Sequence, residues 1–112
     1  MSDSEDRVVE LMRRERDYRA NKRLMEKKAK EKRDKIFHLI DLERQRQDKI
    51  WGGEEHDRGH EIGSWLTYMR SYLQEADNAI THRATGKSVA ISHIIKVVAL
   101  GVACLESHIE EE

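Results

Sequence analysis

The polar residues of one apolar segment are the first candidates for chemistry. Residues 89–105, VAISHIIKVVALGVACL, hold thirteen Ala, Val, Ile, Leu or Cys residues; the exceptions are Ser92, His93, Lys96 and Gly101. His93 and Lys96 are three residues apart, so they share one side of a helix. A lysine buried there needs an acidic partner or a bound anion. We therefore expect an ion pair between Lys96 and Glu75, or a pocket in which His93 and Lys96 hold a phosphate.

A second candidate is a pair of histidines in the glycine-rich segment 52–63, GGEEHDRGHEIG. His56 and His60 are four residues apart with carboxylates beside them, a spacing that lets two histidines share a metal on a helix. The glycines that flank and separate them disfavour a helix here. Two interpretations stay open: a metal site formed with Glu75, or a loop held in place by hydrogen bonds.

The N-terminal third of the chain is rich in basic residues. Residues 13–35 contain 12 Lys or Arg and 5 Asp or Glu. Such a segment is either a basic arm for nucleic acid or an acidic partner, or a solvated helix whose charges compensate each other at i,i+4 spacing. The interleaved acids favour the solvated helix. The residues that would carry the arm are Arg13, Arg14, Arg16, Arg19, Lys22, Arg23, Lys27 and Lys28.

Composition and periodicity predict an all-α fold. Proline is absent and 38% of the residues are charged, and no segment alternates like a strand. We expect a long helix from Ser2 or Ser4, as N-cap, to about residue 48, ended by the glycines at 52 and 53. We expect an antiparallel hairpin of helices 64–83 and 88–109, capped by Ser64 and Ser88, with Thr85 and the following glycine closing the turn.

The apolar helix needs more cover than this chain provides. Because segment 89–105 is apolar nearly all round, it should be buried on several sides, and self-association into a dimer or higher oligomer would complete a helical bundle. It is shorter than a membrane span and carries His93 and Lys96, so we expect no membrane contact. With Cys104 as the only cysteine and no signal-peptide pattern, a cytoplasmic location is expected.

Three segments resemble a known family. Residues 40–52, IDLERQRQDKIWG, and 95–106, IKVVALGVACLE, are similar to conserved segments of phage and prophage MazG-like proteins, and residues 64–80 occupy the place of that family's acidic helix. These proteins belong to the all-α nucleotide pyrophosphohydrolase superfamily. The resemblance covers residues 36–108 and implies a MazG-like helical domain at 36–112, with 1–35 as a charged extension.

The resemblance implies a Mg²⁺ site that this chain does not keep. The family binds the ion through ExxE on one helix and ExxD on the next, and those positions fall here on Tyr72, Glu75, His93 and Lys96. A diverged, non-catalytic protein that binds a nucleotide, another phosphate ligand or a host partner is thus expected, with Trp51 stacking on a base and His93 and Lys96 replacing the metal. The alternative is an active Mg²⁺-dependent hydrolase whose metal has moved to His56, His60 and Glu75.

Overall fold

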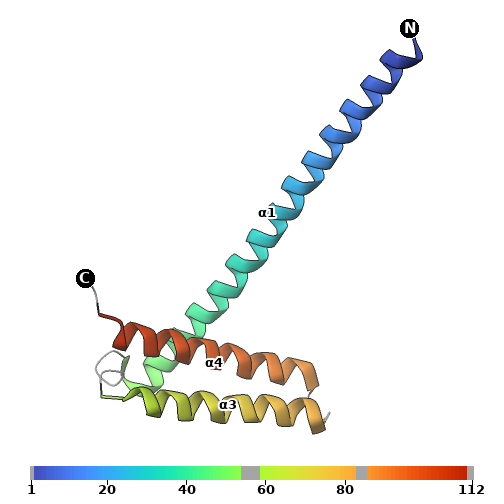
Figure 1. The fold of residues 1–112 in the computed structure, drawn as a ribbon. Coiled ribbons are helices and arrows are strands. Elements are labelled where there is room, and N and C mark those ends of the chain that lie inside the picture. The colour runs from blue at the N-terminus through green and yellow to red at the C-terminus, as the bar shows by residue number, and fades with distance from the viewer. Residues whose placement is uncertain (1, 54–58, 83–85, 111–112) are drawn as a thin grey trace. The chain divides into compact units, whose positions relative to one another are not determined.

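The computed structural model describes residues 2–53, 59–82 and 86–110, and these are helical with no strands. The helices are α1 (Asp3–Trp51), α3 (Ile62–His82) and α4 (Gly86–His108) (Figure 1). The all-α fold expected from composition and periodicity is confirmed. The chain divides into two compact units, Met1–Ile36 and Phe37–Glu112.

The first unit is the N-terminal part of α1, a single exposed helix. Ser2 caps it, as one of the two expected serines: its hydroxyl and carbonyl oxygens accept the N–H of Glu5 at 3.3 and 3.1 Å. Side-chain pairs of opposite charge follow at i,i+3 and i,i+4 spacing, such as Arg14 with Glu10 at 3.2 Å and Lys30 with Asp34 at 2.9 Å. Such pairs stabilise a helix that has no apolar face to bury.

Within the second unit, α1 ends where the glycines predict. Gly52 has a φ of 95°, a conformation that residues with a Cβ rarely adopt, and its N–H donates to the carbonyl of Asp48 at 2.9 Å. The last turns of α1 bring Trp51 against the core of the hairpin.

Helices α3 and α4 run antiparallel and pack along each other, as the short turn between them predicts (Figure 1). The core consists of Trp65, Leu100 and Ala103, all at most 2% exposed. Gly101 of α4 faces Met69 of α3: a Cβ added at Gly101 would lie in ordinary contact, 3.8 Å from the sulfur of Met69. The partly buried side chains that pack against this core are Trp51, Met69, Tyr72 and Cys104.

Both helices of the hairpin begin earlier than predicted. The carbonyl of Glu61 accepts the N–H of Ser64 at 3.0 Å and of Trp65 at 3.3 Å, so α3 already starts at Ile62 and Ser64 is not its N-cap. Helix α4 starts at Gly86, which places Ser88 inside its first turn. Thr85 lies outside the described residues. The cap predictions were wrong because a backbone carbonyl, and not a serine hydroxyl, takes up the first amides of α3.

Helix α4 is less covered than its composition predicts. Its buried residues are Ala90, Ala99, Leu100 and Ala103. Four large apolar side chains on it are 41–56% exposed: Ile91, Ile94, Val98 and Leu105. By length and composition this helix could also cross a membrane, a property that it shares with core helices of soluble proteins. The expected burial on several sides is therefore not reached within one chain.

Candidate functional site

A polar cluster lies where α3 faces the middle of α4. The rings of Tyr72 and His93 stack with centroids 6.0 Å apart, and Lys96 Nζ lies 5.5 Å from the centre of the Tyr72 ring. Glu75 Oε2 is 3.4 Å from His93 Nδ1. Four of the five residues predicted to bind a ligand thus come together: Tyr72, Glu75, His93 and Lys96.

The expected pair between Glu75 and Lys96 is not formed. Glu75 lies against His93, and the lysine ammonium lies over the face of Tyr72, whose ring quadrupole attracts a cation. In the part of the chain that the structure describes, no carboxylate forms an ion pair with Lys96. Its charge is therefore balanced only by an aromatic face, which leaves it able to bind an anion.

Helix α1 adds residues to this cluster that sequence reasoning missed. Gln47 is 2% exposed, and its side-chain amide donates to the carbonyl of Lys96 at 3.4 Å. Arg46 pairs with Glu43 at 2.7 Å, and this hydrogen bond, helped by the nearby Tyr72, raises the pKa of Arg46. Arg46 is thus a second cation beside the cluster. The polar run that holds these residues gave no sign of which side chain would turn inward.

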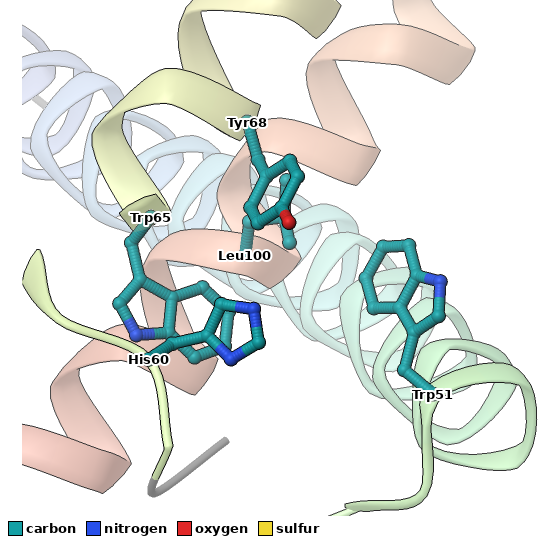
Figure 2. A pocket seen from close by; sticks show the side chains of 5 residues that line it. All are labelled: Trp51, His60, Trp65, Tyr68 and Leu100. Carbon is teal, nitrogen blue, oxygen red and sulfur yellow. The ribbon is translucent and has the colours of Figure 1, made fainter. Parts of the chain in front are cut away.

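An aromatic cavity of about 150 Å³ lies beside the core. Figure 2 shows Trp51, from the end of α1, facing Tyr68 of α3, with ring centroids 6.5 Å apart and an interplanar angle of 22°. The ring of His60 lies 5.6 Å from that of Trp65 and 5.8 Å from that of Tyr68. Leu100 of α4 completes the lining. A cavity of roughly this size accepts a single aromatic ring such as benzene.

The cavity and the polar cluster are neighbours along the same helix pair. Tyr68 lines the cavity and Tyr72 belongs to the cluster; on α4 the corresponding residues are Leu100 and Lys96. Each pair is four residues apart, which is about 6 Å along a helix. Trp51, predicted beside Tyr72 and Lys96, lines the cavity and is not part of the cluster.

The residues of the alternative metal site do not converge. His60 contacts Trp65, whereas Glu75 lies ten residues further along α3, about 15 Å away by helical rise. His56 lies outside the described residues. Among residues 2–53, 59–82 and 86–110, no group of three His, Cys, Asp or Glu side chains is placed to hold a metal ion. The backbone carbonyl of His60 lies 2.9 Å from Nε2 of His108, an arrangement that ties the loop to the end of α4.

A buried arginine joins α1 to α4 in the second unit. The Arg44 side chain is 12% exposed and reaches Asp48 at 3.0 Å and Glu106 at 3.2 Å. Burial opposes its charge, but the hydrogen bond to Glu106 and the charge of Asp48 outweigh that effect and raise the pKa of Arg44. This bridge spans more than sixty residues, so no local sequence pattern indicates it.

The basic arm is exposed and partly neutralised. Ion pairs join Arg13 and Arg14 to Glu10, and Arg19 to Glu15. In the described part of the chain, no ion pair is formed by the other candidates: Arg16, Lys22, Arg23, Lys27 and Lys28. The structure therefore supports the compensated, solvated helix for three of the eight residues.

No family model, curated protein or solved structure matches this chain. The resemblance to MazG-like proteins, with the origin and chemistry that it implies, stays a prediction from the three sequence segments.

Proposed function

We propose that this chain is a diverged, non-catalytic MazG-like protein of phage or prophage origin that binds a nucleotide in the cytoplasm. The base occupies the aromatic cavity, and the phosphates lie toward Lys96. The observation that carries this proposal is the offset of about one helical turn between the cavity and a lysine that pairs with no carboxylate in the described residues.

The aromatic cavity supports the base position. Trp51, Trp65 and Tyr68 present flat apolar surfaces, and stacking on such side chains is sequence-tolerant because every base has a π-face. The cavity is large enough for one ring system only. The base would thus enter the cavity, and the sugar and phosphates would stay outside it, on the side of Lys96.

The cluster chemistry supports binding without hydrolysis. Tyr72, His93 and Lys96 stand where the resemblance expects carboxylates, so the chain has cationic and neutral groups in place of oxygen ligands for Mg²⁺. Lys96 would supply the charge that a metal ion otherwise gives to a phosphate. Glu75 lies against His93 and forms no ion pair with Lys96 among the described residues.

Thermal unfolding in the presence of nucleotides tests the proposal. The probes are ATP, GTP, CTP, UTP and inorganic pyrophosphate, each with Mg²⁺ and with EDTA. A ligand at about 100 times its Kd adds about 2.7 kcal/mol to the unfolding free energy, and we expect this stabilisation to persist in EDTA. Stabilisation that requires Mg²⁺, with release of pyrophosphate, would favour the active hydrolase; no stabilisation would favour a host protein partner.

A matched pair of variants locates the phosphate. Lys96→Met and Arg70→Met each remove one positive charge, but Arg70 is an exposed residue of α3. We expect Lys96→Met to abolish most of the nucleotide-induced shift and Arg70→Met to keep it. Equal loss in both variants would show that only the net charge matters and would contradict the assigned site.

A second candidate function belongs to the basic arm. Arg16, Arg23 and Lys27 form no ion pair in the described structure, and their spacing of seven and four residues places them on one side of α1. This arrangement suits the phosphates of a nucleic acid. Changing the three residues to Gln should weaken binding of labelled duplex DNA and flatten its salt dependence; unchanged binding would exclude this role.

A further inference from the structure

Helix α4 carries an exposed apolar face that residues 37–53, 59–82 and 86–110 of its own unit leave uncovered. Four of its side chains, 41–56% exposed, lie within a sector of about 60° around the helix: Ile91, Ile94, Val98 and Leu105. His93 and Lys96 point to α3, whereas Val102 and Glu106 lie near Arg44 of α1, so α1 borders this sector on one side.

We propose that this face binds the same face of a second copy, with the two α4 helices antiparallel and a twofold axis at Val98. The sequence of the face is nearly palindromic about that residue. Ile91 and Leu105 lie seven residues on either side of it, and Ile94 and Val102, which is half-buried at the edge of the face, lie four residues on either side. A twofold interface requires such self-complementarity, because each residue meets its mirror-related residue on the partner.

The charges at the two ends of the face fit the same arrangement. Lys87 lies eleven residues before Val98, Glu106 lies eight residues after it, and Glu110 follows the end of α4 at His108. An antiparallel pair therefore places the lysine of each copy beside the acidic end of the other. The positive N-terminal end of each helix dipole also meets the negative C-terminal end of its partner. A parallel pair would instead bring like charges together at both ends.

Cysteine cross-linking tests the geometry. In a Cys104→Ala background, Val98→Cys should form disulfide-linked dimers on mild oxidation, because the two Val98 residues meet at the axis. Ile91→Cys alone and Leu105→Cys alone should form no disulfide-linked dimers, since like residues are about 21 Å apart along the helices. A mixture of these two variants should cross-link. Self-linking of Ile91→Cys or Leu105→Cys would show a parallel pair and overturn the proposal.

A charge on the axis tests the interface without cysteines. Val98→Glu places two carboxylates against each other in an apolar contact and should raise the dimer dissociation constant by more than about 100-fold. Ser92→Glu is the matched control, since Ser92 is exposed about 120° around the same helix. Sedimentation gives the association state, and circular dichroism shows that the helices are kept.

Three results would overturn the proposal. A native chain that is monomeric at 100 μM or so has no such interface. Equal dissociation by both glutamate variants would place the contact elsewhere. Partition of the chain into phosphatidylcholine vesicles, lost in Val98→Glu, would show that lipid and not a second copy covers this face.

Discussion

Leu100 is the side chain whose removal should cost the most stability. It is completely buried, belongs to the core with Trp65 and Ala103, and forms one wall of the aromatic cavity. Leu100→Ala removes buried carbons and leaves new empty space that joins the existing cavity of about 150 Å³. Substitutions of this kind cost about 2.7–5.0 kcal/mol, according to the cavity that remains. We expect a loss of about 3–4 kcal/mol.

Chemical and thermal unfolding at one protein concentration measure this loss. For a unit of this size each kcal/mol shifts the Tm by about 4–8 °C, so the Tm should fall by more than about 10 °C. Leu39→Ala is the matched control: it removes the same atoms from a side chain that is 47% exposed and should cost less than about 1 kcal/mol. Similar losses in the two variants would refute the assignment of the core to Leu100 and its neighbours.

Three further predictions follow from buried or paired groups. Burial raises the pKa of the Cys104 thiol, so alkylation at pH 8 should be slower in the folded chain than in denaturant; equal rates would place the thiol in solvent. A hydrogen bond from Arg13 lowers the pKa of the Glu10 carboxyl group below its ordinary value of 4.5. The ionised Glu10 therefore stabilises α1 above pH 4.5, and this stabilisation disappears as the pH falls through the lower pKa of the folded chain. An NMR titration of the Glu10 carboxyl group with a midpoint at or above pH 4.5 would contradict this. The side-chain oxygen Oε1 of Gln47 is buried without a hydrogen bond to any described residue. Gln47→Met should therefore change the unfolding free energy by less than about 1 kcal/mol. A loss of about 3 kcal/mol in a urea titration would show that Oε1 has a hydrogen-bond partner.

The sequence predicts the helices well because their signals are local. The end of α1 follows from Gly52, whose positive φ other residues avoid, and the hairpin follows from the apolar spacing of Trp65, Met69 and Tyr72. The predicted starts of α3 and α4 were two residues too late, since the N-cap of a helix depends on which hydrogen-bond acceptor lies nearest to its first backbone amides. Ser64 was displaced from that role by the carbonyl of Glu61.

The candidate site was predictable only in part. The polar residues of the apolar helix drew attention to Lys96 and His93, and in the structure both contact Tyr72, although Lys96 is only half-buried. Which side chains contact each other depends on how α3 and α4 pack: Lys96 lies over the ring of Tyr72, and Glu75 lies against His93. The aromatic cavity combines residues from three distant segments, so no spacing rule could assemble it.

Tryptophan fluorescence tests nucleotide binding at this site most directly. The chain has two tryptophans, Trp51 and Trp65, and both line the cavity. In EDTA, ATP should change the emission in a saturable, one-to-one manner, and Lys96→Met should weaken this response about tenfold or more. Pyrophosphate, which has no base, should compete with ATP without changing the emission. No response to any nucleotide, or a response that appears only with Mg²⁺, would contradict a metal-free nucleotide site between α3 and α4.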